Sequence, residues 1–524
     1  MRAAALLALA AGCGAPDAGA APALDPRPET SRFGVDYVFP LDPYYRDPAL
    51  ARTLAATGAG WVNFHEVSWA QTEPHAPRGG VHAYRWEALD EAVRIWERAG
   101  FRIVFTLRLQ DGWFAGPPHH QMPFPMPLAF FFERNADRLP RDLEDYRAWI
   151  RSLVERYDGD GVDDLPGLRH PVRHFQIGNE YANPMFWLGA EDEYATLLRA
   201  ARAAARAASP DAVVISQGIR WNDLFEGDPG GEHFEEVFGG FLATLPDDAH
   251  RQEWRRARRI TEATVALAGE WDVLDAGGNG PYAGASSGYM AWVRAEMAKG
   301  RLQAEIWDAE ARCEPQIAVV PYGSYHPELE VPGGQQILAG LRRGDPAVVR
   351  WYRAEQARVL AQVFVARFAA GFEKVFLGMA TDWDHSLGAL STPNPFLGLV
   401  DRGGHAWPAL YALRDLRAAL DGFATAERVE AGSGVFLARF TFAGGRAPVW
   451  VAWLEEERVR GLDDPLPARP VRLPGVTGVQ RVRAVPTTSD RAEEVPFEAG
   501  TAWLGLTLGP TPVIVEQERP PGGT

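Results

Sequence analysis

The segment WEALDEAVRIWERAGFRIVFTL, residues 86–107, carries the pattern that decides the fold. Its first part, residues 86–99, spaces apolar residues as an amphipathic helix does. Gly100 follows, and the β-branched and aromatic run over 102–107 is typical of a buried strand. Helix and strand in such close alternation predict a β/α repeat with a parallel sheet.

The same alternation extends in both directions from this segment, over residues 33 to 420. Strands are predicted at 33–37, 61–65, 102–107, 172–177, 212–216, 271–274, 304–309 and 374–377. Helices are predicted at 48–57, 86–99, 143–157, 191–208, 234–245, 288–299, 345–371 and 407–420. Eight strands, each followed by a helix, predict a closed (β/α)8 barrel.

Beyond Gly422 the helical periodicity ends, and the chain alternates as antiparallel strands do. Strand-like runs lie at 434–445, 447–456, 469–475, 479–487 and 510–517, with turn residues between them. We therefore expect the barrel over 31–421, an antiparallel β-sandwich accessory domain over 422–518 and a disordered tail over 519–524.

The composition is that of a folded, acidic protein of 524 residues. Apolar residues make up 46% and charged residues 23%, which argues against wholesale disorder, and the length favours two or more domains. Lys and Arg total 53 against 69 Asp and Glu, which gives a net charge of -16. Because an acidic protein repels phosphate, we expect no nucleic-acid partner.

The N-terminal segment MRAAALLALAAGCGAP, residues 1–16, resembles a bacterial export signal. Arg2 precedes a short apolar run, and small residues stand before Cys13 as in a lipoprotein processing site. We expect a signal peptide over 1–12, lipid attachment at Cys13 and a flexible tether over 13–30. Plain secretion and an uncleaved N-terminus are the alternatives. The expected location is the cell envelope, with the lipid as the membrane contact.

Carboxylates stand at the ends of two predicted barrel strands. Glu180 follows the run FQIGN, and Glu310 ends the run QAEIWDAE. Because the active site of such a barrel lies at the carboxyl ends of its strands, both residues point to chemistry. Two carboxyl groups across the barrel mouth can flank a glycosidic bond, where one donates a proton and the other attacks the anomeric carbon. The alternative is that both are solvated and cap neighbouring helices.

These features resemble the retaining glycoside hydrolases of clan A. In that superfamily an Asn precedes the acid/base glutamate, as Asn179 precedes Glu180, and the nucleophile ends an apolar strand, as Glu310 does. The stretches over 69–107, 381–386 and 398–413 are also similar to the superfamily. The resemblance implies that Glu180 is the acid/base, Glu310 the nucleophile and Asn179 a contact to a carbohydrate substrate, with no metal or organic cofactor.

The resemblance also implies contacts around the reacting sugar. Trp383 corresponds to an indole platform beneath the sugar, and Tyr282 is the candidate to orient Glu310. The sugar itself stays open, with exo-acting β-xylosidase or α-L-iduronidase types and cellulase-like endo-enzymes as the nearest kinds. A non-catalytic surface protein that binds carbohydrate on the same barrel is the alternative function.

Other aromatic and histidine side chains are candidates to line the substrate cleft. The loop over 110–133 offers Trp113 and His120 as a substrate wall, or it packs as a cover on the barrel. His65 either contacts the sugar or is a satisfied packing residue. No carboxylate or Cys lies at ligand spacing from the His pair in this loop, so no metal site is expected. The segment 313–344 is expected to be a lid or an interface.

Strand alternation adds one expectation about the seventh strand. Ile306, Asp308 and Glu310 should share one face, which would place Asp308 inside the barrel just below Glu310. A buried carboxylate needs a partner, and an inward arginine such as Arg108 is the candidate, unless the register is off by one.

Overall fold

The computed structural model describes most of the barrel and of the C-terminal domain. The described residues are 30–119, 133–183, 185–220, 234–245, 247–277, 285–300, 302–313, 315, 331–383, 394–456 and 459–517. The predicted signal peptide, Cys13, His120, Tyr282 and the predicted tail lie outside the described residues. None of the described helices has both the length and the apolar character needed to cross a membrane.

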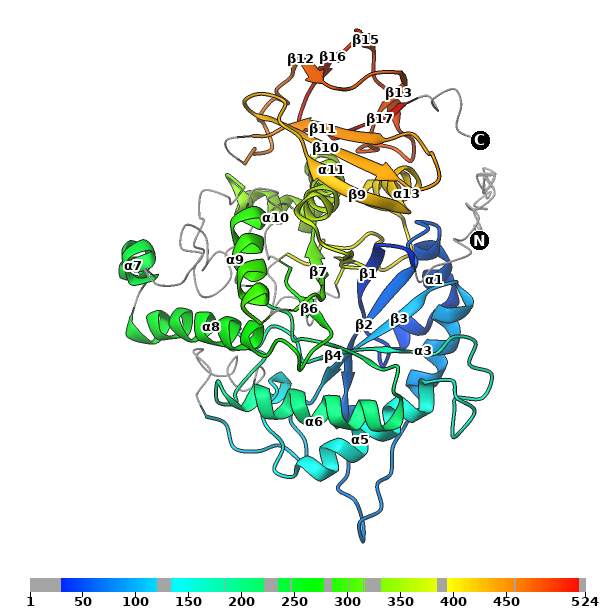
Figure 1. The fold of residues 1–524 in the computed structure, drawn as a ribbon, viewed down its shortest axis with the longest axis vertical. Coiled ribbons are helices and arrows are strands. Elements are labelled where there is room, and N and C mark those ends of the chain that lie inside the picture. Colours follow the sequence, from blue (N-terminus) through cyan, green and yellow to red (C-terminus); the bar gives the residue numbers. More distant parts are fainter. Residues whose placement is uncertain are drawn as a thin grey trace, which may run out of the picture.

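Eight parallel strands close into a barrel in chain order, and β1 pairs with both β2 and β8 (Figure 1). The strands are β1 (Phe33–Val38), β2 (Trp61–Ser68), β3 (Arg102–Arg108), β4 (His174–Ile177), β5 (Val213–Ile215), β6 (Val273–Asp275), β7 (Glu305–Arg312) and β8 (Lys374–Gly378). The predicted barrel is therefore confirmed.

Helices surround this barrel (Figure 1). They are η2 (Pro43–Arg46), α1 (Pro48–Ala55), α2 (Trp69–Thr72), α3 (Glu87–Arg98), α5 (Leu143–Tyr157), α6 (Glu193–Ala208), α7 (Phe234–Thr244), α8 (Asp248–Ala266), α9 (Ala285–Lys299), α10 (Gly334–Arg343), α11 (Pro346–Ala370) and α13 (Pro408–Leu420). The main apolar core includes side chains from the strands and from these helices, with Trp96, Trp149 and Leu360 fully buried in it. The amphipathic faces predicted from the sequence are thus the faces that bury the barrel wall.

Besides the short helices η2 and α2, two longer helices are absent from the sequence-based prediction. The sequence pattern predicts no helix over 248–266, where α8 lies, or over 334–343, where α10 lies in the segment expected to be a lid. In α8, Trp254, Ala257 and Ile260 form a buried stripe. The many charged residues between them make the helical spacing of the apolar residues hard to recognise in the sequence.

The interior of the barrel is filled by an apolar layer. Its members come from six strands and form a cluster separate from the helix-covered core: Trp61, Val104, Ile215, Val273, Trp307, Ala309 and Phe376. Gly34 makes room for this layer, because a Cβ there would lie 2.3 Å from an atom of the Phe376 ring. The barrel is therefore a packed core rather than a pore, and chemistry is confined to its mouth.

The seventh strand departs from simple alternation. Its pairing with β8 shifts register between Asp308 and Ala311, as a β-bulge does. Trp307 and Ala309 belong to the apolar layer inside the barrel, which leaves Asp308 on the outer face. The bulge brings Glu310 back toward the barrel mouth, so Asp308 and Glu310 do not share a face.

The partner expected for Asp308 is therefore wrong. Asp308 pairs with Arg367 of the outer helix α11, with Nε to Oδ2 at 2.9 Å. Arg108 instead pairs with Asp137, with Nε to Oδ2 at 2.7 Å. Both ion pairs are buried, which satisfies the charges that burial would otherwise make unfavourable.

The C-terminal domain consists of two antiparallel sheets (Figure 1). Its strands are β9 (Phe423–Arg428), β10 (Val435–Phe442), β11 (Val449–Leu454), β12 (Arg469–Pro474), β13 (Val479–Ala484), β14 (Glu493–Glu494), β15 (Phe497–Ala499), β16 (Trp503–Leu508) and β17 (Val513–Gln517). One sheet has the order β14-β13-β17-β11-β10-β9 and the other β12-β16-β15. An apolar cluster that includes Leu437, Leu473 and Leu504 joins them, so the predicted β-sandwich is confirmed.

The sandwich packs against helix α11 of the barrel. Phe436, Phe440 and Trp453 belong to the same apolar cluster as the barrel helices. Arg460 adds a buried double contact, because its two terminal nitrogens lie 3.0 and 2.9 Å from the two carboxylate oxygens of Glu355 on α11. The accessory domain thus covers one side of the barrel.

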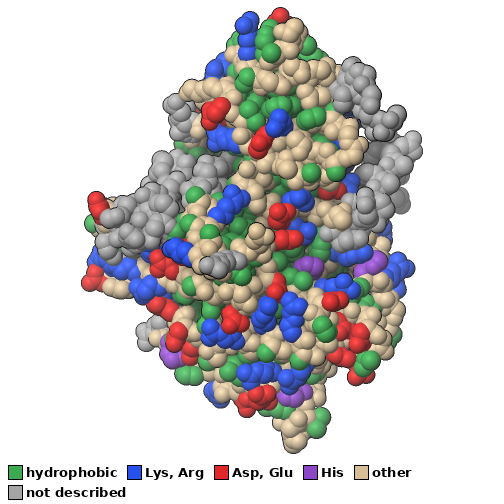
Figure 2. Space-filling view, viewed as in Figure 1, with side chains coloured by type: hydrophobic (Ala, Val, Ile, Leu, Met, Phe, Trp, Pro, Cys, Tyr) green, Lys and Arg blue, Asp and Glu red, His purple; other side chains and the backbone are tan. Residues whose placement is uncertain are grey.

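Charged side chains of both signs are interspersed on the surface in view in Figure 2. Some form exposed ion pairs, such as Arg259 with Glu191 at 2.7 Å and Arg199 with Glu270 at 2.9 Å. Exposed pairs of this kind contribute at most about 1 kcal/mol each. Stability therefore depends on the apolar layers rather than on the charged surface.

Candidate active site

Glu180 and Glu310 lie together at the barrel mouth. Glu180 follows β4 and is 7% exposed, while Glu310 lies in β7 and is 2% exposed. Asn179 joins the two strand ends, because its Nδ2 donates a hydrogen bond to Glu310 Oε2 at 2.8 Å. The structure therefore brings together the two carboxyl groups and the Asn that the sequence analysis singled out.

Glu310 is surrounded by groups that favour its ionised form. The Tyr37 hydroxyl donates a hydrogen bond to Oε1, Asn179 donates to Oε2, and Arg220 Nε lies 3.5 Å from Oε2. Burial by itself would raise the pKa of Glu310, but Arg220, His65 and the two hydrogen bonds outweigh it and lower that pKa well below its ordinary value. Glu310 is thus an anion over the range in which most proteins work.

Arg220 is held in place by a second carboxylate. Its NH1 and NH2 donate to the two oxygens of Asp275 in β6 at 2.9 and 2.6 Å, and both side chains are fully buried. Asp275 also accepts from Gln176 Nε2 at 2.7 Å and from the backbone N–H of Ala309 at 2.9 Å. The guanidinium is therefore fixed before any substrate binds.

Glu180 is in the opposite situation. Burial raises its pKa, and the negative charge of nearby Glu310 raises it further, while Arg220 and a hydrogen bond from Asn183 lower it less. Asn183 Nδ2 donates to Glu180 Oε2 at 3.2 Å. Glu180 therefore keeps its proton at pH values where an ordinary Glu has lost it. Two adjacent carboxyl groups with pKa values pushed apart are suited to be an acid and a nucleophile.

Backbone strain gathers at the same end of the barrel. Tyr37, Glu66, Gln110 and Glu180 have φ values of 58, 63, 60 and 51°, in the left-handed region. Each lies at or just after the carboxyl end of one of the strands β1 to β4. A left-handed conformation costs a non-glycine residue about 1–2 kcal/mol. Such strain is typical of functional sites, where an unusual backbone conformation holds a side chain in an orientation that packing alone would not give.

The structure places the remaining predicted contacts as follows. His65 is buried, and its ring stacks on Tyr37 with centroids 4.3 Å apart. Trp383 lies beside the same ring, with centroids 6.0 Å apart. Trp113 packs edge-on against Trp69 at 5.6 Å, and its Nε1 donates to a backbone carbonyl. His65 and Trp383 thus lie next to the tyrosine that holds Glu310.

Three residues of this site do not appear among the sequence-based candidates: Asp36, Tyr37 and Arg220. Asp36 and Tyr37 end the strand FGVDYV, and Arg220 ends the run SQGIR after β5. The available signal is a polar residue at the carboxyl end of a predicted barrel strand, which is the rule that identifies Glu180 and Glu310.

Two groups of described side chains have ligand atoms close enough to share a metal ion. The first is Asp36, His65 and Glu310, and the second is Asp158, Asp160 and Asp164. In the first group the Glu310 oxygens already accept hydrogen bonds, and the cationic Arg220 lies beside them, so we assign no metal there. The second group is a polar loop that ends helix α5, and proximity alone assigns it no ion.

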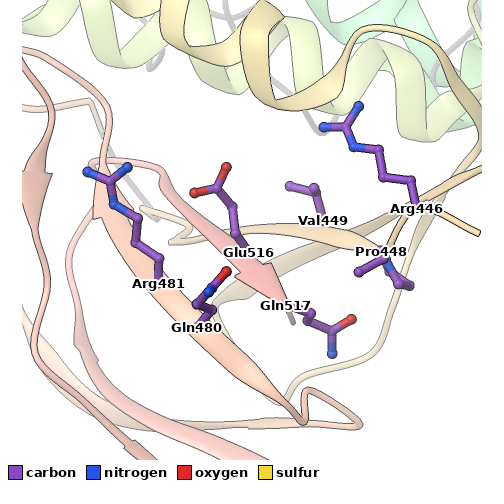
Figure 3. Close-up of a pocket in the computed structure, with 8 residues that line it drawn as sticks. Arg446, Pro448, Val449, Gln480, Arg481, Glu516 and Gln517 are labelled. Carbon is purple, nitrogen blue, oxygen red and sulfur yellow. The ribbon is translucent and has the colours of Figure 1, made fainter. Parts of the chain in front are cut away.

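A separate hollow lies on the C-terminal domain, outside the barrel mouth (Figure 3). It is lined by Arg446, Ala447, Pro448, Val449, Gln480, Arg481, Glu516 and Gln517. These residues come from around strands β11, β13 and β17 of the sandwich (Figure 3). The hollow contains no pair of carboxyl groups comparable to Glu180 and Glu310 among its lining residues.

The turn before Glu180 has no room for a side chain. Gly178 has a φ of 77°, and a Cβ there would lie 2.2 Å from Tyr181 Cζ. The Tyr181 hydroxyl donates to Asp137 at 2.7 Å, and Asp137 pairs with Arg108. The turn that presents Glu180 is therefore tied to β3 by a buried polar chain.

We expect Gly178→Ala to destabilise the protein more than Gly167→Ala. Gly167 has a similar φ of 79° but nothing within 4 Å of its Cβ position, so it measures backbone strain alone, about 1–2 kcal/mol. Gly178→Ala adds overpacking against Tyr181, about 1–3 kcal/mol more. Urea unfolding of both variants checks the difference, and equal losses would contradict the tight turn.

Comparison with known proteins adds the class of fold. No protein-family profile and no curated protein matches the sequence. Among solved structures, a monomeric β-xylosidase from Caulobacter crescentus CB15 is similar with a TM-score of 0.53 and 14% identity, over 93% of this chain and 96% of that chain. A family 39 glycoside hydrolase from the gut symbiont Bacteroides cellulosilyticus WH2 is similar with a TM-score of 0.52 and 14% identity, over 93% and 81%.

A GH39 enzyme from Xanthomonas axonopodis pv. citri is also similar, with a TM-score of 0.51 and 14% identity over 94% of each chain. At these identities the likeness establishes a shared fold. The chain therefore shares its fold with these enzymes, and the predicted resemblance is confirmed at the level of the fold.

Proposed function

We propose that this chain is a retaining glycoside hydrolase, with Glu180 as the acid/base and Glu310 as the nucleophile. The observation that carries the proposal is the meeting of two buried carboxyl groups at the barrel mouth, with Arg220 and two hydrogen-bond donors gathered on Glu310. This arrangement lowers the pKa of Glu310, while burial and the charge of Glu310 raise the pKa of Glu180. Such a pair offers a proton to a leaving oxygen and an anion to the anomeric carbon. The structural neighbours are themselves glycoside hydrolases, which supports this class of reaction.

The mechanism follows from where the proton is held. Glu180 gives its proton to the glycosidic oxygen while a Glu310 oxygen attacks the anomeric carbon, so the bond to the leaving group breaks as a glycosyl ester forms. Glu180, now a carboxylate, takes a proton from water, which attacks the same carbon and releases Glu310. Two displacements restore the original anomeric configuration. The reaction uses no metal or organic cofactor.

Asn179 has the geometry to bind the sugar beside the reacting carbon. Its Nδ2 donates to Glu310, while its Oδ1 is buried and accepts no hydrogen bond from the described residues. That oxygen is enclosed beside Gly218, so the second Nδ2 hydrogen is the one available to a substrate hydroxyl. The contact would fix the sugar relative to the nucleophile, and contacts of this kind strengthen in the transition state.

The neighbours' names suggest which substrates to test first. They include a β-xylosidase, an endoxylanase and a family 51 α-L-arabinofuranosidase. Aryl xylosides and arabinofuranosides are therefore the first substrates to try, before hexosides and polysaccharides.

We also propose that the protein is exported to the cell envelope, since its predicted signal peptide ends before Cys13.

We expect Glu310→Ala to lose at least about 1,000-fold in kcat on any substrate, because no ester can form without the carboxylate. Glu180→Ala should lose about 100- to 10,000-fold on a glycoside with a poor leaving group. Its loss in the first step should be far smaller on a dinitrophenyl glycoside, whose leaving group needs no proton. Steady-state kinetics on a matched pair of aryl glycosides checks both.

The matched control is Glu305→Gln at the other end of β7. Glu305 is exposed and accepts a hydrogen bond from Trp307 Nε1 at 2.7 Å, at the amino end of the strand. This variant should keep near wild-type hydrolysis. Near wild-type hydrolysis by Glu310→Ala instead would refute the nucleophile.

The stereochemical result is part of the same experiment. NMR of the first product should show the anomer of the substrate, and a 2-fluoroglycoside should label Glu310 covalently in the peptide mass spectrum. A sugar that raises the melting temperature with neither turnover nor labelling would instead support the non-catalytic carbohydrate-binding protein.

The profile of kcat/KM against pH should be bell-shaped, and it should be wider than two carboxyl groups with ordinary pKa values would give. Glu310 must be ionised, and because its pKa is lowered, activity should fall on the acid side only below about 4.3, the ordinary Glu value. Glu180 must be protonated, and because its pKa is raised, activity should persist above that value and fall at higher pH.

Glu180→Gln identifies the alkaline limb. It should remove that limb for a dinitrophenyl glycoside, because no proton remains to be lost at this position. Glu305→Gln should leave both limbs in place. An alkaline limb at the ordinary Glu pKa in the wild type would rule out Glu180 as the raised group.

A further inference from the structure

Asp36 is a buried carboxylate for which the proposed mechanism has no direct use. It lies in the strand FGVDYV, has no exposed surface, and neither of its oxygens accepts a well-formed hydrogen bond from the described residues. An ionised carboxylate in such a place is unfavourable unless a positive charge accompanies it. The nearest partner is His65, whose Nδ1 lies 3.5 Å from Asp36 Oδ1.

His65 lies beside both Asp36 and Glu310. It comes from β2, it is 4% exposed, and among the described residues its Nδ1 has no hydrogen-bond acceptor other than the nearby Asp36 carboxylate. Its ring stacks on Tyr37 with an interplanar angle of 13°, and the Tyr37 hydroxyl donates to Glu310. Polar atoms of Asp36, His65 and Glu310 all lie within 4.8 Å of one another. When His65 carries a proton on each ring nitrogen, it is a cation next to the two carboxylates of Asp36 and Glu310.

We propose that Asp36 is a positioning residue that keeps His65 protonated and fixed behind Glu310, so that the carboxylate of Glu310 stays ionised and aimed at the sugar. The inference rests on the function proposed above. It gives His65 a role in the reaction through its charge, in addition to any contact with the sugar. Asp36 itself touches neither the sugar nor the reacting atoms, because its side chain is fully enclosed.

The electrostatics agree with this geometry. Burial alone would lower the pKa of His65, but Asp36, Glu310 and Glu66 together outweigh burial and raise that pKa. His65 in turn lowers the pKa of Glu310. The charged and titratable groups that act on these side chains are Asp36, Tyr37, Glu66, Glu180, Arg220, Glu310 and Arg312.

Arg220 cannot replace His65 in this role. It lies at the other carboxylate oxygen, 3.5 Å from Oε2, and its two terminal nitrogens are bound to Asp275. The Tyr37 hydroxyl occupies Oε1, and His65 stacks behind that ring. Glu310 thus has two cations near it, one permanent and one that exists only while Asp36 holds a proton on His65.

The test compares Asp36→Asn, His65→Gln and the double variant with the wild type. Asp36→Asn keeps the side-chain volume but removes the charge, so His65 should lose its extra proton near neutral pH. The value of kcat/KM at neutral pH should then fall about 10- to 100-fold. This loss should shrink on the acid side, because burial raises the pKa of Asp36 and leaves the wild-type carboxyl protonated there as well. If Asp36 acts through His65, the double variant should lose no more than His65→Gln alone.

A second readout needs no substrate. Nitrogen-15 NMR of labelled histidine should show His65 as imidazolium at pH 7 in the wild type and as neutral imidazole in Asp36→Asn. The matched control is Asp272→Asn, which removes a carboxylate that pairs with Arg202 and Arg206 just before β6, at the opposite end of the barrel. It should leave the His65 signal and the pH profile unchanged.

The outcomes separate this inference from the proposed function. A neutral His65 in the wild type at pH 7, or a further loss when Asp36→Asn is added to His65→Gln, would overturn the role of Asp36. If Asp36→Asn does not fold, the wild-type spectrum and the acid limb of His65→Gln still decide, because loss of the imidazolium must move that limb to higher pH. If the wild type turns over no glycoside but its His65 is protonated, the proposed hydrolase function is rejected and the effect of Asp36 on His65 is not.

Discussion

The buried guanidinium of Arg220 is the interaction on which the site depends. A cation removed from water is tolerated only when carboxylates surround it, and Arg220 binds Asp275 through two nitrogens and approaches Glu310 with the third. Asp275 also takes a hydrogen bond from the backbone of Ala309, in the bulged part of β7. One charge therefore links the end of β5 with β6 and β7, and fixes the carboxylate that the proposed mechanism needs ionised.

This link explains how two carboxyl groups in one enclosed space have different protonation states. Burial alone would raise the pKa of both, as it does for any carboxylate removed from water. The cation and the hydrogen-bond donors are gathered on Glu310, and the negative charge that results keeps Glu180 protonated. The asymmetry thus comes from where the donors lie rather than from how deeply each group is buried.

Prediction from the sequence worked where local pattern is decisive. The eight barrel strands repeat a short apolar run before each helix, and a carboxylate at the end of the fourth and seventh runs identified Glu180 and Glu310. It failed where one extra residue changes the phase of a strand. The bulge after Asp308 puts this residue on Arg367 instead of inside the barrel, and alternation gives no sign of the bulge.

The sequence by itself determined the order of strands and helices, the presence of a β-sandwich after them, and two glutamates at strand ends, because each depends on residues that are neighbours along the chain. Only the tertiary structure decided which groups determine the protonation states of those glutamates. Tyr37, His65, Asn179 and Arg220 come from four different parts of the barrel wall. Their effect on Glu310 exists only once the closed barrel brings Tyr37, Asn179 and Arg220 within hydrogen-bond or ion-pair range of it and His65 within 4.8 Å.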